Sequence, residues 1–325
     1  MRRLFFAALA FVTVLASCVE QGPPVGTPLM PSTDKKTLYP QTEVGEILKS
    51  NRAEKIVDVL WDTTFNVTTG LDYYQFQLLT YDGDKLDTYL LRVDRSKDLD
   101  LKVGISAKTT PTVWQRQILS EMMAQMSTPE KPVYAMVNGD FCDNRTPIRP
   151  RGPVHCDGKI MAQGYSQDPY YKHQGLSYLG VTLDGNMTIG PTADYESAKS
   201  TLKECTGGGV ILIKDYEIQG GLVVWNTDRD PRTAVGYTSD NIVWILSVDG
   251  RHKGTEGMTY IEMASIFQSL QCERAVNLDG GGSTEMLIRH PYGGHIVLCN
   301  WPSDPTDGDG GEERPRPTTW AVVKK

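Results

Sequence analysis

The chain has 325 residues, of which 22% are charged and 39% hydrophobic, and its formal net charge is −7. This composition is typical of a globular protein and carries no signature of disorder. At this length the chain holds one large domain or two smaller ones, with a substantial buried core. The acidic balance argues against nucleic acid as the main partner, because no basic patch stands out that would neutralise phosphates.

The N-terminus has the layout of a secretory signal. Two arginines precede a short apolar run, and small residues lead directly to Cys18. The run is too short for a transmembrane helix, and Leu-Ala-Ser-Cys resembles the cleavage site of a bacterial lipoprotein. We expect residues 1–17 to be removed and Cys18 to carry lipid. The protein is then exported and membrane-anchored in the bacterial cell envelope, on its periplasmic or surface side. An ordinary signal peptide is the alternative.

Five further cysteines follow Cys18: Cys142, Cys156, Cys205, Cys272 and Cys299. An exported protein permits disulfides, but an odd number leaves at least one thiol outside any internal pair. Cys142 and Cys156 bracket a loop rich in Pro and Arg and are the first candidates for a bridge. No pair has the spacing of a metal site, so we predict no zinc.

Residues 18–55 include a stretch rich in Pro and Gly and are predicted to tether the fold to the lipid. One domain is expected at 56–325. Its first part, 56–110, is predicted to be β-rich, and the turn at residues 81–84 indicates a hairpin. The expected strands of this part are 56–61, 74–80, 87–93 and 99–105.

Two helices are predicted from apolar residues that recur at helical spacing. The first is 113–126, where a methionine stripe marks the buried side. The second is 260–270, where Thr259 is a plausible N-cap with Glu262 at the capping-box distance. This spacing gives Glu262 a structural role.

Three apolar stretches that resemble buried strands end in an Asp beside a Gly: Asp140, Asp249 and Asp279. Ligands tend to bind at the carboxyl ends of strands in sheets covered by helices. The three acids can therefore converge on one pocket. The alternative is a set of tight turns, since Asn138-Gly139 is also a hairpin signal. A further glycine run at 206–209 lacks the Gly-Lys-Ser/Thr of a phosphate loop and is predicted to be a structural turn into a strand.

These motifs resemble the phosphodiester glycosidase family. The core of the resemblance is Asn-Leu-Asp-Gly-Gly-Gly-Ser at 277–283, preceded by Asp-Gly-Arg at 249–251 and Gly-Met-Thr at 257–259. Outlying matches bring its extent to about residues 60–323. After Glu-Arg-Pro the family usually continues with a small residue, Asn and Ala, whereas this chain has Arg316-Pro317-Thr318-Thr319. The segment 306–311 also looks inserted.

The resemblance implies cleavage of a sugar-1-phosphodiester of the GlcNAc-1-phosphate type, which yields free sugar and a phosphomonoester on a glycan. The expected fold is α+β, with mixed β-sheets and a few packed helices in a single catalytic domain. A bacterial lipoprotein has no mannose-6-phosphate tag to uncover, so the substrate is expected to differ from the mammalian one.

Candidate site residues follow from this chemistry, because a glycosidase normally uses two carboxylates and a phosphate needs positive charge. The catalytic candidates are Asp279, Glu285, Asp140, Asp249 and Arg232. The candidates for binding sugar or phosphate are Asn138, Thr233, Arg251, Asn277, Gly280, Gly281, Gly282, Ser283, Thr284 and Arg314.

Two alternatives stay open at this stage. Asp140 and Asp279 are also possible ligands of a divalent cation, because Ca²⁺ and Mg²⁺ prefer oxygen; no cofactor is certain. The rival function is a non-catalytic surface lipoprotein that binds glycans, which the 6 Trp and 15 Tyr would suit. Clustered acids at strand ends favour the enzyme.

Overall fold

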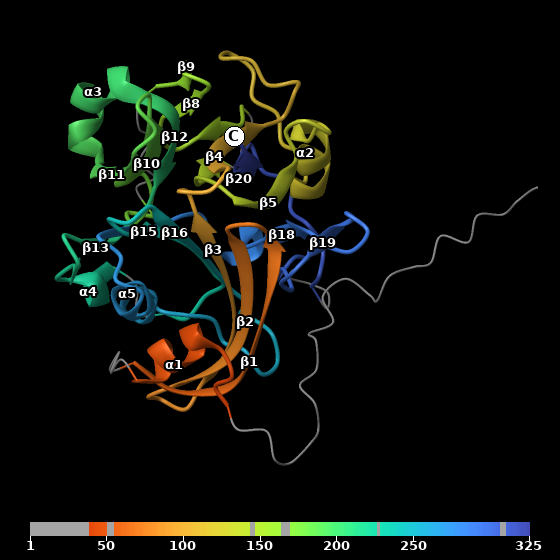
Figure 1. Ribbon diagram of the computed structural model, residues 1–325. Coiled ribbons are helices and arrows are strands. Elements are labelled where there is room, and N and C mark those ends of the chain that lie inside the picture. Colours follow the sequence, from red (N-terminus) through yellow and green to blue (C-terminus); the bar gives the residue numbers. More distant parts are fainter. Residues whose placement is uncertain (1–38, 51–54, 144–146, 164–169, 226–227, 306–309) are drawn as a thin grey trace, which may run out of the picture.

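The structure is a computed structural model that describes residues 39–50, 55–143, 147–163, 170–225, 228–305 and 310–325. The predicted signal peptide and Cys18 lie outside these residues. The described chain folds into one compact domain of four antiparallel sheets and five short helices (Figure 1). The α+β prediction is confirmed, and every strand pairing within the described residues is antiparallel.

The largest sheet has eight strands and runs through the middle of the molecule. Its order is β1 (Ile56–Thr68), β2 (Leu71–Thr80), β3 (Lys85–Asp94), β16 (Ile242–Val248), β15 (Arg232–Tyr237), β17 (Arg274–Asn277), β13 (Ile211–Lys214) and β14 (Glu217–Ile218). The hairpin predicted at residues 81–84 joins β2 to β3.

Two five-stranded sheets and one two-stranded sheet complete the fold. One is β11 (Met187–Pro191), β10 (Ser177–Thr182), β12 (Leu202–Gly208), β8 (Val154–Cys156) and β9 (Lys159–Ala162). The other is β19 (Ile296–Leu298), β18 (Met286–Arg289), β5 (Val133–Asn138), β20 (Thr318–Lys324) and β4 (Leu99–Ile105). The smallest pairs β6 (Cys142–Asp143) with β7 (Arg149–Pro150).

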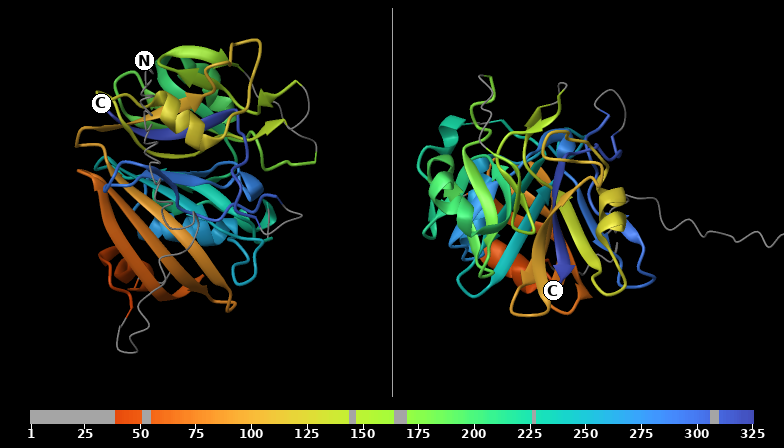
Figure 2. Two further views of the ribbon diagram at one scale, coloured as in Figure 1. Left: turned by 90° about the vertical axis from the view of Figure 1, so that its right-hand side faces the viewer. Right: turned by 90° about the horizontal axis from the view of Figure 1, so that it is seen from above.

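The sheets are stacked in layers with helices outside, as the three views show (Figures 1 and 2). One face of the eight-stranded sheet packs against the five-stranded sheets, and the buried Leu91, Val243, Val137, Leu179 and Trp320 belong to this shared core. Its other face is covered by helices α1 (Glu43–Ser50) and α5 (Tyr260–Ser269). The remaining helices are α2 (Leu119–Met126), α3 (Tyr195–Ala198) and α4 (Leu222–Trp225), with 3₁₀ turns at Thr192–Asp194, Lys199–Thr201 and Gly281–Ser283.

Helix α5 begins and ends close to where the sequence places it. The Thr259 hydroxyl accepts from the Glu262 N–H, and the Glu262 carboxylate accepts from the Thr259 N–H, which completes the predicted capping box.

The first predicted helix is too long by a turn and a half. Residues 113–118 are not helical: Gln117 forms a β-bridge with Arg316, and the helix begins only at Leu119. Trp114, which fits the helical spacing, is instead buried in the core between the sheets. Tertiary pairing thus overrides the local periodicity.

Three smaller expectations also need correction. Gly207 and Gly208 lie inside strand β12 rather than in a turn, and Gly207 passes so close to Gly152 that a side chain would not fit. Asn138-Gly139 ends β5 and is not a hairpin turn. Cys156 is a free thiol, so the proposed bridge to Cys142 is not formed.

Helix α1 lies inside the stretch assigned to the tether, 18–55. Its Val44 and Leu48 are buried in the core of the eight-stranded sheet, and Asp62 on β1 accepts two hydrogen bonds from Thr42. The folded part therefore begins before residue 56. None of the helices in the described part of the chain is long and apolar enough to cross a membrane.

Candidate active site

The order of the large sheet brings the predicted residues to one edge. Strand β15 lies between β16 and β17 and is antiparallel to both. The carboxyl ends of β16 and β17, and the beginning of β15, therefore meet at the same edge. This places Asp249, Asp279 and Arg232 at the same end of the sheet. Strand β5 of the neighbouring sheet ends beside them, because the Asp279 N–H donates to the Gly139 carbonyl at 3.2 Å.

Asn138 joins these strand ends from behind. Its Nδ2 donates to the Asp279 carbonyl at 2.8 Å, and its Oδ1 accepts from the Thr233 hydroxyl at 2.7 Å and from the Glu285 N–H at 3.2 Å. The side chain is fully buried. The sequence predicts Asn138 and Thr233 as ligands of the substrate, whereas their hydrogen bonds in the structure are internal and hold the glycine loop in place.

The glycine loop turns sharply through a short 3₁₀ segment, Gly281–Ser283, with Gly281 at a φ of +63°. The Gly280 N–H donates to Asp279 Oδ1 at 2.9 Å and the Gly281 N–H to the Pro231 carbonyl at 2.9 Å. Two of the three amides predicted to face a phosphate are thus used inside the loop. A side chain at Gly282 would overlap the Arg314 guanidinium and the Asp304 carboxylate, so both would have to move to admit one.

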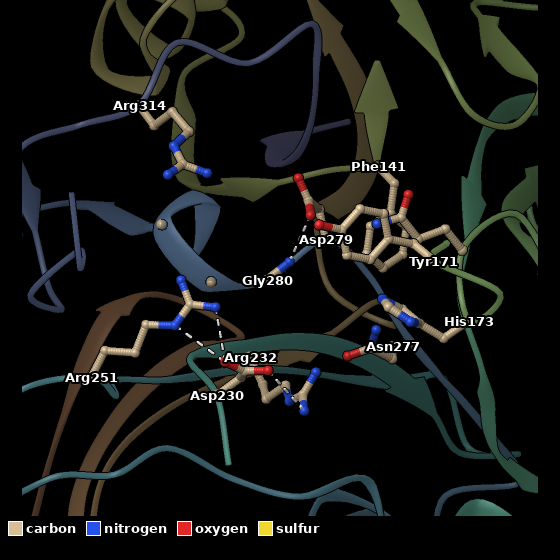
Figure 3. A pocket seen from close by; sticks show the side chains of 13 residues that line it. Phe141, Tyr171, His173, Asp230, Arg232, Arg251, Asn277, Asp279, Gly280 and Arg314 are labelled. Atoms are coloured by element: carbon tan, nitrogen blue, oxygen red, sulfur yellow. Dashed lines mark hydrogen bonds and ion pairs between the residues drawn. The ribbon is translucent and has the colours of Figure 1, made fainter. Parts of the chain in front are cut away.

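A pocket of about 200 Å³ opens in front of the loop (Figure 3). Its lining comes from segments far apart in the sequence: Phe141, Tyr171, His173, Gln174, Asp230, Arg232, Arg251, Asn277, Asp279, Gly280, Gly281, Gly282 and Arg314. Eight of the predicted site residues are among them: the three glycines with Asp279, Arg232, Arg251, Asn277 and Arg314.

Three arginines supply positive charge to this pocket. Arg251 pairs with Asp230 at 2.9 Å, and Arg314 pairs with Asp304 through two nitrogens and lies 3.4 Å from the Ser283 hydroxyl. Both guanidinium groups remain partly exposed, with 44% and 30% of the side chain accessible.

Arg232 is buried and more firmly held than the other two. Its Nε donates to the Met258 carbonyl at 2.9 Å, its guanidinium lies 4.5 Å from the centre of the Tyr260 ring, and it lies 3.5 Å from Asp230. Its position is fixed by the fold before any ligand binds.

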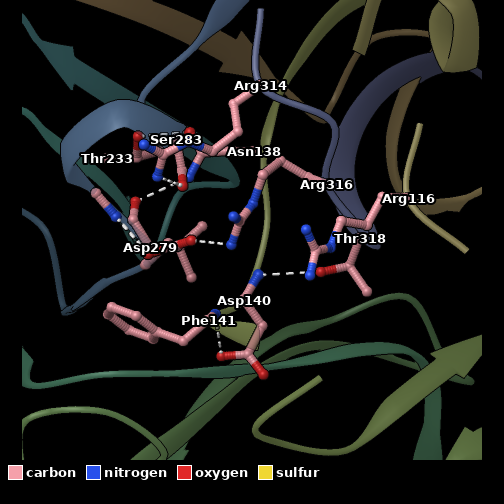
Figure 4. Close-up of polar contacts among 12 residues, drawn as sticks. Arg116, Asn138, Asp140, Phe141, Thr233, Asp279, Ser283, Arg314, Arg316 and Thr318 are labelled. Carbon is pink, nitrogen blue, oxygen red and sulfur yellow. Dashed lines mark hydrogen bonds and ion pairs between the residues drawn. The ribbon is translucent and has the colours of Figure 1, made fainter. Parts of the chain in front are cut away.

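Asp279 is the acidic candidate that faces the pocket. Arg316 donates to its Oδ2 and the Gly280 N–H to its Oδ1 (Figure 4). Both side chains are largely buried, at 13% exposure for Asp279 and 3% for Arg316. Burial lowers the pKa of Arg316, but the surrounding acidic groups, Asp279 first among them, together outweigh it and the net pKa is raised. The carboxylate is therefore fixed in direction by a permanent cation.

Asp140 and Asp249 lie outside the lining. Asp140 accepts from the N–H groups of Phe141 at 2.8 Å and Gly152 at 2.7 Å. Asp249 accepts from the Tyr89 hydroxyl at 2.9 Å, from Asn300 Nδ2 at 2.9 Å and from the Trp301 N–H. Burial raises the pKa of each carboxyl to about 7. Both acids organise the loops that follow their strands.

Glu285 is fully buried behind the loop. Its Oε1 accepts from the Arg314 N–H, and no described group donates to its Oε2. Burial raises its pKa well above the ordinary value. Ser283 and Thr284, at the end of the loop, are buried as well and are not part of the pocket lining.

The structure adds residues that the sequence analysis does not select. Asp230 lies directly before the Pro-Arg-Thr motif and links two of the arginines; Arg316 follows Glu-Arg-Pro and holds Asp279. The position of each of these two residues next to a motif was the signal in the sequence that could have identified it. Phe141, Tyr171 and His173 form an aromatic wall, with ring centres 5.8 and 6.0 Å apart across His173. No sequence motif marks residues 171–173.

Within the described ranges, no group of three or more His, Cys, Asp or Glu side chains lies close enough together to hold a metal ion. The predicted cation at Asp140 and Asp279 stays a prediction, and an ion at Asp279 would compete with the Arg316 guanidinium for the same carboxylate.

Solved structures with a similar fold come from distant organisms. The zebrafish N-acetylglucosamine-1-phosphodiester α-N-acetylglucosaminidase catalytic domain, auto-inhibited by its pro-peptide, is 17% identical with a TM-score of 0.59 over 89% of this chain and 95% of that one. A hypothetical protein from Synechocystis is 14% identical with a TM-score of 0.55 over 81% of this chain and 64% of that one. At these identities the likeness concerns the fold alone.

Sequence comparison gives the family. The uncharacterized SPbeta prophage-derived protein YomE of Bacillus subtilis (strain 168) is 32% identical over an alignment of 174 residues, and the match covers 46% of this chain and 27% of that protein. The chain thus spans about a quarter of this curated relative. The family model described as phosphodiester glycosidase matches residues 131–323, more than half of the chain and all the segments that line the pocket. The chain belongs to the phosphodiester glycosidase family.

Proposed function

We propose that the pocket hydrolyses a sugar-1-phosphodiester, cleaving the bond between C1 and the phosphate oxygen. The products are the free sugar and a phosphomonoester on the other alcohol, which for an envelope protein is a glycan or a related polymer. The observation that carries this proposal is the combination of one oriented carboxylate, Asp279, with two partly exposed arginines, Arg251 and Arg314, around the same small cavity.

Asp279 is the proposed catalytic carboxylate. It acts at C1, either as the nucleophile or as the base that takes a proton from the attacking water. In both cases the electron pair of the C1–O bond leaves with the phosphate, which needs little protonation. Arg316 and the Gly280 N–H keep the carboxylate oriented, so little reorganisation accompanies the reaction.

The phosphate is proposed to bind mainly to guanidinium groups. Arg314 and Arg251 flank the glycine loop, and Arg232 adds a buried positive charge. Guanidinium groups fit the two free oxygens of a phosphodiester in a bidentate manner. Of the three loop amides, only that of Gly282 is not used by the hydrogen bonds described above, so backbone binding contributes less than the sequence suggests.

The decisive assay offers the purified protein a panel of alkyl phosphodiesters of common sugar 1-phosphates, including GlcNAc, and follows the release of free sugar. In ¹⁸O-labelled water, attack at C1 places the label on the sugar, whereas attack at phosphorus places it on the phosphate. Label on the sugar supports the proposal. Label on phosphate, or binding without turnover across the panel, would overturn it; the latter result would support the glycan-binding alternative.

An assay in the presence of a chelator tests whether the reaction needs a divalent cation. Full activity in excess EDTA removes Ca²⁺ and Mg²⁺ from the mechanism, and activity that is lost and then restored by one metal establishes it.

We also propose that the protein is a lipoprotein of the bacterial cell envelope. The signal-like residues 1–17 and Cys18 support this location.

A further inference from the structure

The side chain of Asn277, at the end of β17, is held in one direction. The residue is 1% exposed, its N–H donates to the Val210 carbonyl at 3.0 Å, and its carbonyl accepts from the Gly209 N–H at 2.8 Å. The side-chain Nδ2 donates to the Leu278 carbonyl at 2.7 Å. No donor among the described residues reaches Oδ1. Figure 3 shows this oxygen turned toward the middle of the pocket.

The orientation of this amide is fixed by chemistry. Exchanging its oxygen and nitrogen would set two carbonyl-type acceptors 2.7 Å apart with no proton between them. The Asn277 Oδ1 therefore offers the pocket a hydrogen-bond acceptor.

An acceptor discriminates between the two halves of the substrate. The oxygens of an ionised phosphodiester only accept hydrogen bonds, so they gain nothing from Oδ1. A sugar carries hydroxyl groups, and an N-acetylated sugar also an amide N–H, all of which donate. A buried acceptor without a partner is unfavourable, and a ligand that supplies a donor removes that cost.

We propose that Asn277 Oδ1 accepts a hydrogen bond from a hydroxyl or amide N–H of the sugar and selects sugars that present a donor at that position. The sugar then lies against Asn277, His173 and Phe141, and the phosphate lies toward Arg251 and Arg314. This inference rests on the proposed function and adds to it the orientation of the substrate and a residue that determines its specificity.

The surroundings of Asn277 agree with a sugar subsite. The aromatic wall of Phe141 and His173 stands on its side of the cavity, and Arg251 and Arg314 stand on the opposite side (Figure 3). Gly209 lies directly behind the wall, because a side chain there would come within 3.0 Å of the Phe141 ring and 3.2 Å of Asn277 Nδ2. Burial, and then the charge of Arg232, lower the pKa of His173, so the ring is neutral at pH 7 and does not attract the phosphate.

The test couples substrate changes to protein changes. Methyl phosphodiesters of a cleaved sugar 1-phosphate and of its monodeoxy or deacylated analogues are compared in the wild-type enzyme and in Asn277→Leu. In the wild type, removal of one particular donor should lower kcat/KM by about tenfold or more. In Asn277→Leu the same removal should cost less than about twofold, because the acceptor is gone.

Two further variants complete the design. Asn277→Asp keeps an acceptor and should retain most of the discrimination, although its overall rate falls. Asn277→Ala replaces the Leu variant if circular dichroism shows that the latter does not fold. Equal effects of every donor removal in the wild type and in the variant without an acceptor would overturn the inference.

Failure of the inference is distinguishable from failure of the proposed function. If the wild type cleaves the panel and no donor couples to residue 277, only the inference is wrong. If the wild type cleaves no member, the proposed function is wrong. Calorimetric binding of the methyl glycosides and their deoxy analogues to the same variants then decides the inference by the same coupling criterion.

Discussion

At the scale of single residues, the surroundings separate acids that look alike in the sequence. Asp140, Asp249 and Asp279 each follow an apolar strand and stand beside glycine. In the fold, backbone and side-chain donors enclose the first two, whereas Asp279 reaches the pocket with an arginine behind it. The three acids therefore differ in the groups that the fold places around each strand end.

Replacing Asp279 tests its proposed role. Asp279→Asn should lower kcat by about 10²–10⁴-fold, the usual range for loss of a group that transfers a proton in the transition state, and by more if it is the nucleophile. Steady-state hydrolysis of the best phosphodiester in the panel measures this. Asp184→Asn, in an exposed hairpin turn, is the control and should leave the rate unchanged. A folded Asp279→Asn enzyme with wild-type turnover would exclude the assignment.

Asp249 should make stability depend on pH in an unusual direction. Burial raises its pKa to about 7, above the value of about 3.9 expected in the unfolded chain. The native state then binds more protons than the unfolded state between these values, so the stability that Asp249 contributes is fully present below about pH 4 and is lost as pH rises through about 7.

The variant Asp249→Asn does not titrate there, so its destabilisation should be larger at pH 5 than at pH 8. Urea unfolding of wild type and variant at both pH values measures the difference. A destabilisation that grows with pH would show that the carboxylate is ionised in the fold.

At the scale of elements, the loop before β15 controls the floor of the pocket. Arg229 binds both oxygens of Glu262 at 2.8 Å and so ties this loop to the capping box of α5. Gly257 passes directly against the Asp230 backbone, with a φ of +95°. Both contacts fix Asp230 and Arg232 from below.

Two glycines with the same backbone angle allow this contact to be isolated. Gly254 also has a φ of +95°, but a Cβ there would meet no atom within 4 Å. Gly254→Ala should cost about 1–2 kcal/mol for its backbone conformation. Gly257→Ala should cost about 1–3 kcal/mol more, because the methyl group overlaps the Asp230 backbone.

Chemical denaturation of the two variants gives the comparison, and Gly257→Ala should also lower kcat/KM through displacement of Asp230. Equal losses of stability would show that the close approach carries no energetic weight.

At the scale of the whole molecule, the pocket lies where two sheets meet. Arg232 and Asn277 come from the eight-stranded sheet, Asp230 from the loop before β15, and Phe141 follows a strand of the neighbouring sheet. The family model begins at residue 131. Strands β1, β2 and β3 precede it but belong to the eight-stranded sheet that carries the site, and β3 pairs with the whole length of β16. The β-rich N-terminal part is therefore built into the domain that carries the site.

The proposed lipid anchor predicts a change in location. If the lipid is attached to the Cys18 thiol as proposed, Cys18→Ala in the full-length chain should move the protein from the membrane fraction to the soluble fraction. Fractionation followed by immunoblotting measures this. The control is Cys156→Ala, which removes a free thiol from the folded part of the chain. A Cys18→Ala protein that stays in the membrane fraction would contradict the lipoprotein proposal.

The sequence by itself determined the class of fold, the hairpins, helix α5 and the importance of the glycine loop. These features rest on local chemistry: apolar periodicity, a capping box, and glycine where the chain must turn. The sequence also predicted eight of the thirteen residues that line the pocket, since these eight lie in or beside motifs.

Only the tertiary structure decided which polar groups face the pocket and which support it. Asn138 and Thr233 form a hydrogen bond behind the glycine loop, Arg316 fixes Asp279, and residues 171–173 close one side of the cavity. The non-helical residues 113–118 illustrate the same point, because Gln117 forms a β-bridge with Arg316, which lies far along the chain. These arrangements depend on pairing between segments up to two hundred residues apart. The residues next to a polar group in the sequence do not show which distant group will form its hydrogen bond.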